Sequence, residues 1–173
     1  MTELIFLIAG VLVFSGFFSG SEAALLSITQ AEVETFMREK RWGAHVLHSV
    51  QKSLNRAIIA IVIMNNIVNI IGSVFVGNRV LHLYGDAMLA IVTAALTFGV
   101  IIFSEILPKS LGIHYANKIA IPVAFAIRVL TMALLPIILL IETMTNFFNR
   151  GEGRKVGTEQ QIRSLATLGR RAG

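Results

Sequence analysis

The sequence FFSGSEAALLS, residues 17–27, places a carboxylate and several hydroxyls inside a segment that is otherwise apolar. It closes a run from Leu4 to Ile28 that contains no lysine or arginine. About 20 such residues cross the hydrocarbon core of a bilayer, so this run predicts a membrane span. A carboxylate at membrane depth is costly, roughly 2.5–3.5 kcal/mol on insertion scales. We therefore expect the polar side chains of this stretch to face other helices and to mark a functional site.

The composition indicates an integral membrane protein. Of the 173 residues, 55% are hydrophobic and only 14% are charged, whereas about 25% are charged in a soluble domain. The net charge of +5 is typical of cytoplasmic loops and of contacts with anionic lipid, so we do not expect nucleic-acid binding. The absence of cysteine excludes disulfides and thiolate metal sites. The start MTEL lacks a positive n-region, so the first run is expected to be a retained span.

The hydrophobic pattern predicts an all-α membrane protein with three spans. These lie at about residues 4–28, 57–76 and 87–107. Gly77–Asp86 is the expected turn between the second and third spans, with Asp86 as an N-cap. Residues 30–54 alternate apolar and basic residues at helical spacing, which predicts helices at the membrane surface with Trp42 at the headgroups. A solvated helical hairpin is the alternative for that stretch.

The distribution of lysine and arginine decides whether a fourth apolar run, Ile119–Ile141, crosses the membrane. The loop after the first span is strongly basic, the next loop contains only Arg79, and the C-terminal tail is basic again. The positive-inside rule then places the N-terminus outside and everything after Leu107 inside, with three crossings. Residues 119–148 are expected to form interfacial or re-entrant helices on the cytoplasmic side, divided near Pro136. Four crossings are the alternative.

Polar residues of the three spans lie at similar depth. Ser21 is about 10 Å and Asn66 about 13 Å from the cytoplasmic ends of their spans, at 1.5 Å per residue, and Glu105 lies near that end of the third. Pro108 lacks an N–H and leaves the carbonyl of Ser104 without its helical partner, so we expect a kink or unwinding there.

The polar residues at this shared depth in the three spans together predict a site whose ligands are oxygen atoms. They are the hydroxyls of Ser19 and Ser21, the amide oxygens of Asn65, Asn66 or Asn69, the carboxylate of Glu105 and backbone carbonyls. Such hard donors suit Mg2+, Ca2+, Na+ or K+ better than zinc or copper.

Structural roles are the alternative for each of these residues. Serine and asparagine in membrane helices often bond a neighbouring helix or their own backbone. Asn65 and Asn66 point about 100° apart, so both are not expected on one ion. The acids Glu22 and Glu105 have Arg56, Lys109 and Arg128 as candidate partners for structural ion pairs. Since no histidine lies in a span and no Ser–His or paired-acid arrangement is visible, we do not expect an enzyme.

Three motifs in order, FFSGSEAALLS (17–27), IVIMNNIVNI (61–70) and IIFSEILPKSLG (101–112), resemble the transmembrane domain of the CorC/cyclin-M (CNNM) family of magnesium transporters. The resemblance covers about residues 3–150, and we assign 1–150 to this domain. It implies a homodimer with three spans per subunit, an outside N-terminus and an inward-facing Mg2+ site. It also implies Mg2+ export coupled to Na+ entry across the cytoplasmic membrane.

The family's site residues correspond to named positions in this chain. They are Ser19, Ser21, Asn65, Asn66, Asn69 and Glu105, with the carbonyl of Gly20 as a further donor. Family members usually continue into cytoplasmic CBS domains, so we expect this sequence to be a transmembrane portion, with 151–173 as the start of a linker helix. ATP regulation cannot be argued from it.

The sequence thus predicts a Mg2+ exporter in which Ser19, Ser21, Asn66 and Glu105 hold the ion. One alternative is a membrane anchor and dimerisation module for cytoplasmic regulatory domains, in which the polar residues only join helices. Another is a passive divalent-cation channel. The residues alone do not separate Mg2+ from other divalent cations, nor do they fix the coupling ion or the direction.

Overall fold

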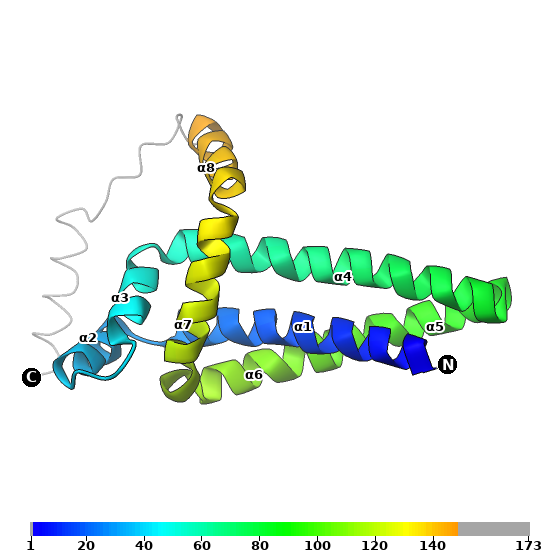
Figure 1. The fold of residues 1–173 in the computed structure, drawn as a ribbon, viewed down its shortest axis with the longest axis horizontal. Coiled ribbons are helices and arrows are strands. Elements are labelled where there is room, and N and C mark those ends of the chain that lie inside the picture. Colours follow the sequence, from blue (N-terminus) through cyan, green and yellow to red (C-terminus); the bar gives the residue numbers. More distant parts are fainter. Residues whose placement is uncertain (1, 149–173) are drawn as a thin grey trace, which may run out of the picture. The chain divides into compact units, whose positions relative to one another are not determined.

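The computed structural model describes residues 2–148, which are helical apart from short connections, with no strand among them (Figure 1). The all-α prediction is therefore confirmed. The chain divides into two units, Met1–Ile138 and Leu139–Gly173, and all the long helices belong to the first. The linker helix predicted for 151–173 lies outside the described residues.

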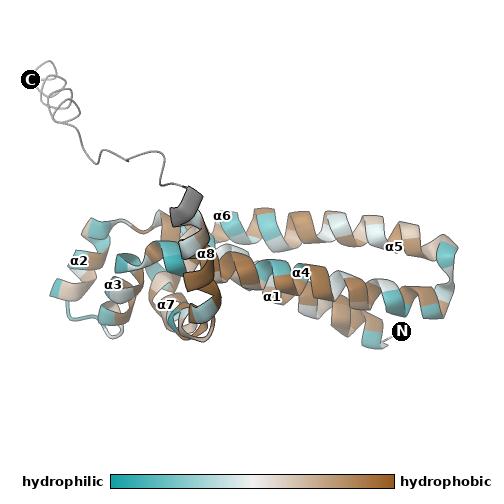
Figure 2. Cartoon of the chain, turned by 90° about the horizontal axis from the view of Figure 1, so that it is seen from above, coloured by the Kyte–Doolittle hydropathy of each residue, from teal (hydrophilic) through white to brown (hydrophobic). Residues whose placement is uncertain are grey.

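Three long helical rods lie side by side (Figure 1). They are α1 (Thr2–Ser27), α4 (Leu54–Tyr84) and a continuous rod made of α5 (Asp86–Gly99), η1 (Val100–Ile106) and α6 (Leu107–His114). Each rod is long and apolar enough to cross a bilayer, and by the same measure so is α7 (Ala116–Ala133). Figure 2 shows mostly hydrophobic rods, with a hydrophilic turn between α4 and α5 at one end.

Three shorter elements gather at the opposite end of the rods, where α1 ends. They are α2 (Gln30–Arg38), α3 (Ala44–Lys52) and α7, and we call them the belt. Helix α7 runs across the rods rather than along them, as Figures 1 and 2 both show. The end of the bundle without the belt is called the far end.

Local sequence explains how the belt begins and how it ends. Thr29 caps α2 through a reciprocal capping box with Glu32, whose carboxylate accepts from the Thr29 N–H at 2.8 Å. Helix α7 continues through Pro122 and stops at Leu134, close to the division predicted from Pro136. Helix α8 (Leu135–Phe148) follows at once.

The turn predicted at Gly77–Asp86 is much shorter than these bounds. Helix α4 continues to Tyr84, and the chain turns at Gly85, whose φ of +76° suits a glycine. Asp86 is the first residue of α5 and not its N-cap. The helix continues because Val76 and Val80, one turn apart, are buried together with Leu96 in an apolar cluster, which stabilises the extra turns.

Apolar packing is concentrated at the two ends of the rods. The larger cluster joins the end of α1 to the belt and the start of α4, with Leu25, Leu47 and Ile127 fully buried. The smaller one, at the far end, contains Leu4, Val76, Val80 and Leu96. Among the residues whose burial the structure describes, the buried polar side chains are four serines, Ser15, Ser19, Ser21 and Ser104. The bundle therefore buries hydroxyls along α1 and on η1, and each of them needs a hydrogen-bond partner.

Candidate cation site

Helices α1 and α4 meet through polar side chains as well as apolar ones. The Ser15 hydroxyl donates to Oδ1 of Asn65 at 2.7 Å. One turn further along α1, Ser19 is fully buried, and its hydroxyl has no hydrogen-bond partner among residues 2–148. A buried polar atom without a partner costs free energy, so the Ser19 oxygen is a candidate contact for an ion or a water.

Small residues bring α1 against the third rod. A Cβ added to Gly20 would stand 3.2 Å from the Pro108 carbonyl oxygen, and one added to Gly112 would collide with the Gly20 carbonyl. A Cβ on Gly16 would lie 3.2 Å from Cγ of Pro108. The two backbones therefore pack as closely as glycine allows. The Gly20 carbonyl, a predicted ligand, faces Gly112 in this arrangement.

Glu105 lies in an unusual stretch of backbone. Residues 100–106 form a π-helix, and the N–H of Leu107 donates to the carbonyl of Ile102, five residues earlier. The helix continues past Pro108, which stands in the first turn of α6, so the structure has a change of winding where the sequence predicts a kink or unwinding. The wider turn accommodates a residue that cannot donate, and π-helical segments occur frequently at functional sites.

The π-helix is attached to α1. The Ser104 hydroxyl donates to the carbonyl of Leu12 at 2.9 Å, and Ser104 is fully buried. Since Glu105 is the next residue, this hydrogen bond holds the backbone from which its side chain leaves the helix against α1.

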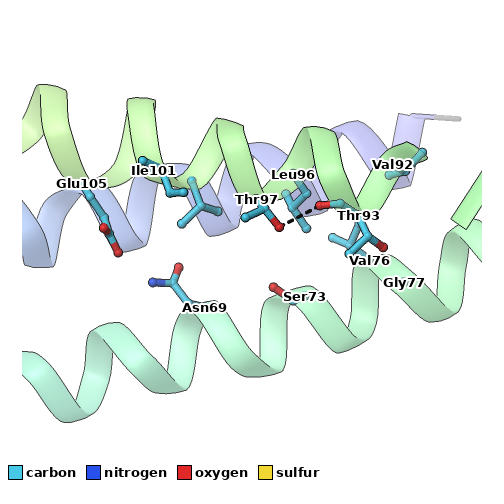
Figure 3. A pocket seen from close by; sticks show the side chains of 11 residues that line it. Asn69, Ser73, Val76, Gly77, Val92, Thr93, Leu96, Thr97, Ile101 and Glu105 are labelled. Atoms are coloured by element: carbon cyan, nitrogen blue, oxygen red, sulfur yellow. Dashed lines mark hydrogen bonds between the residues drawn. The ribbon is translucent and has the colours of Figure 1, made fainter. Parts of the chain in front are cut away.

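Asn69 and Glu105 share a pocket of about 270 Å3 between α4 and the third rod. Figure 3 shows both side chains directed into the space between the helices. Oδ1 of Asn69 is buried without a partner, and Glu105 has no hydrogen bond or ion pair with any residue of the described part of the chain. The pocket therefore combines a carboxylate and an amide oxygen that are both free to accept.

The structure does not bring every predicted ligand to this pocket. Ser21 lines a different, mostly apolar pocket against Pro108 and α7, and its hydroxyl donates to the Phe17 carbonyl at 2.6 Å. Asn66 is exposed, and its amide N–H2 donates to the Val62 carbonyl at 2.9 Å, which leaves Oδ1 free. Oδ1 of Asn65 accepts the hydrogen bond from the Ser15 hydroxyl.

Glu22 forms a structural ion pair, which was one of the two roles expected for this acid. Its carboxylate lies 3.7 Å from Nζ of Lys109 and joins α1 to α6 near the belt. Glu105, which has no such ion pair among the described residues, is thus the acid near the middle of the rods that is available to bind a cation. Within residues 2–148 no three acidic or histidine side chains group as a metal cluster, so any cation site there depends on hydroxyl, amide and carbonyl oxygens around one carboxylate.

Sequence reasoning missed the roles of Ser15, Ser73, Thr97 and Ser104. Ser15 and Ser19 are four residues apart and thus on one face of α1, as Asn65 and Asn69 are on α4. Matching these two spacings would have predicted a polar seam between the helices. Nothing in the sequence pattern singles out Ser73, which enters the pocket because it lies one turn after Asn69 on α4.

Comparison with known proteins identifies the family of this chain. The model of the cyclin M transmembrane N-terminal domain matches residues 6–173. The chain belongs to the CNNM family. It is 38% identical over its full length to a UPF0053 protein of Synechocystis, half of whose length it covers. It is 32% identical to the UPF0053 inner membrane protein YfjD of Escherichia coli, over 82% of this chain and 33% of that protein.

A plant relative is more distant. A chloroplastic DUF21 domain-containing protein of Arabidopsis is 26% identical over 76% of this chain and 20% of its own length. The chain thus spans at most about half the length of these CNNM relatives.

Proposed function

We propose that this chain is the transmembrane part of a transporter that exports Mg2+ across the cytoplasmic membrane, coupled to Na+ entry. One observation carries the proposal: the carboxylate of Glu105 and the buried Oδ1 of Asn69 line one pocket and have no partner among the described residues. Membership of the CNNM family supports it. Mg2+ prefers a few carboxylates and keeps several waters, which suits a site with one acid.

The chemistry of transport follows from this donor set. Glu105 neutralises part of the ion's charge, and neutral oxygens replace some of the waters that Mg2+ gives up reluctantly. With a single carboxylate the ion is held weakly enough to be released, as transport requires. Asn69 is the amide we assign beside Glu105. The Ser19 hydroxyl is buried without a partner among the described residues but does not line this pocket.

The charge distribution supports three crossings with the N-terminus outside and the C-terminus inside. Basic residues are concentrated at the belt and the adjoining end of α6: Arg38, Lys40, Arg41, Lys52, Lys109 and Lys118. At the far end Arg79 forms an ion pair with Glu3. The positive-inside rule places the belt in the cytoplasm. Helix α7 crosses the rods transversely, which suits a surface helix better than a fourth span (Figure 1).

A homodimer would explain why the amide of Asn66 lies on an exposed face of α4. Asn66, Ile70 and Val74 follow one another at four-residue spacing on α4 and are all exposed. A polar amide that faces lipid is costly, and a second copy would cover it. Asn66→Leu separates two roles: weaker dimerisation with unchanged Mg2+ affinity indicates an interface residue, and the reverse indicates a ligand.

Substitution of Glu105 tests the transport proposal. Purified wild type in proteoliposomes is expected to move Mg2+ in response to an imposed Na+ gradient, and Glu105→Gln is expected to abolish this flux and weaken Mg2+ binding measured by calorimetry. Glu34→Gln, an exposed acid on α2, is the matched control and should behave as wild type.

The other functions give different results in the same assays. An anchor and dimerisation module predicts no Mg2+ flux and no Mg2+-dependent thermal stabilisation of wild type. A passive channel predicts flux that does not depend on the Na+ gradient. Either result would refute the coupled exporter.

A further inference from the structure

The pocket that contains Glu105 extends from this carboxylate toward the far end of the bundle, away from the belt. Figure 3 shows Asn69, Ser73, Thr97 and Thr93 along its length. Val76 and Leu96 line the pocket and also belong to the far-end apolar cluster. Apolar side chains therefore line the part of the pocket that lies toward the outer surface.

The outer half of the pocket is lined by hydroxyl groups and has no charged side chain. Glu105 is the one ionisable residue in the pocket lining, and the other polar side chains are Asn69, Ser73, Thr93 and Thr97. The Thr97 hydroxyl donates its proton to the Thr93 carbonyl at 2.9 Å. Its oxygen lone pairs remain available to accept a hydrogen bond from a water or to contact a cation.

The size of the pocket fits a hydrated divalent ion. Six waters at about 30 Å3 each occupy about 180 Å3, and Mg2+ takes octahedral coordination. The pocket measures about 270 Å3. The volume of the pocket therefore exceeds that of the six waters in a complete Mg2+ shell.

We propose that Ser73, Thr93 and Thr97 form an outer vestibule in which Mg2+, released by Glu105 and Asn69, regains its water shell before it leaves. Rehydration lowers the cost of dissociation from the carboxylate because the waters replace the lost ligands step by step. Ser73 and Thr97 are exposed in the single chain, so the vestibule requires that the second subunit of the proposed homodimer covers that side. This inference rests on the proposed transport function.

Transport rate and binding affinity distinguish a vestibule residue from a ligand. Thr97→Val keeps the shape and removes the hydroxyl, and we expect the rate of Mg2+ efflux from proteoliposomes to fall about fivefold to tenfold, the equivalent of one hydrogen bond. Mg2+ affinity measured by calorimetry should stay within about twofold of wild type. The control is Thr143→Val, which removes a hydroxyl that likewise donates four residues back in its own helix, at 2.7 Å, but lies outside the pocket.

A second measurement does not depend on transport. The sequence has no cysteine, so Thr97→Cys provides a unique thiol. Hexaamminecobalt(III), a stable mimic of hydrated Mg2+, is expected to slow its reaction with a hydrophilic thiol reagent. The same probe should not slow the reaction of Thr143→Cys. Absence of protection at Thr97, or an unchanged efflux rate in Thr97→Val, overturns the vestibule. If wild type shows neither Mg2+ flux nor Glu105-dependent binding, the proposed function fails first, and the vestibule with it.

Discussion

The hydroxyl of Ser15 donates to Oδ1 of Asn65 at 2.7 Å and joins α1 to α4 in the bundle. Ser15 is fully buried, and Asn65 is partly buried. Hydrogen bonds between membrane helices contribute on average about 0.6 kcal/mol and at most about 1.7 kcal/mol.

Ser15→Ala is therefore expected to destabilise the folded protein by about 1 kcal/mol, since it leaves the Asn65 amide oxygen unpaired. The measurement is unfolding in mixed micelles, with the exposed Ser49→Ala as control. A double-mutant cycle with Asn65→Ala should show coupling between the two sites. Additive effects would mean that the bond contributes nothing to stability.

Close packing between α1 and α6 gives a larger expected effect. Gly112→Ala adds a Cβ that collides with the Gly20 carbonyl, which is backbone and cannot turn aside. We expect loss of thermal stability, or failure to purify as a folded protein, because the rods must separate to admit the methyl group. Gly10→Ala is the matched control, since nothing lies within 4 Å of the Cβ it would add. Equal stability of the two variants would contradict the packing described here.

The depth of each polar residue in the membrane could be predicted from the sequence. The direction in which its side chain points around the helix axis could not. The rise per residue is constant, so the levels of Ser21 and Asn66 follow from counting. The neighbouring helix that each side chain faces depends on how closely the rods approach one another. It also depends on the rotation per residue along each helix. The π-helix at 100–106 changes the rotation per residue beside Glu105. The structure thus groups Glu105 with Asn69, whereas counting grouped it with Asn66.

The apolar runs predicted the helices well and their ends less well. The sequence predicts a turn from Gly77, yet α4 continues through it because the packing of Val76 and Val80 outweighs the helix propensity that a glycine loses, about 1 kcal/mol. The T-Q-A-E sequence at Thr29–Glu32 is a capping box, and it could have located the start of α2 to the residue. The cation ligands themselves stay a prediction.

The belt is expected to respond to acid through Glu32. Its carboxylate accepts from the backbone N–H of Thr29 and from Nδ2 of Asn117, at 2.8 and 2.9 Å, and these bonds lower the pKa of Glu32. A carboxyl whose pKa is lowered in the folded state contributes stability above its ordinary pKa of about 4.3, and that stability is lost as the pH falls through the lowered value.

Comparison of Glu32→Ala with wild type tests this link between α2 and α7. The variant is expected to melt below wild type at pH 7, and the gap should shrink at pH values below about 4. Glu34→Ala removes an exposed acid from the same helix and should show no such pH-dependent gap. A gap that stays constant with pH would indicate that the carboxylate charge is not involved. The measurement is the thermal unfolding midpoint in detergent across this pH range.

The number of crossings can be measured directly because the chain has no cysteine of its own. Single cysteines at Asp86, Lys52, Lys118 and Thr145 sample the far end, the belt and α8, and all four positions are exposed. With three crossings, a membrane-impermeant thiol reagent added outside intact cells should label Asp86→Cys alone. The other three should react only after the membrane is opened, since the basic belt end is cytoplasmic. Labelling of Thr145→Cys from outside, with Lys118→Cys still protected, would show that α7 crosses the bilayer as a fourth span, and its transverse course against the rods would then have to change in the membrane.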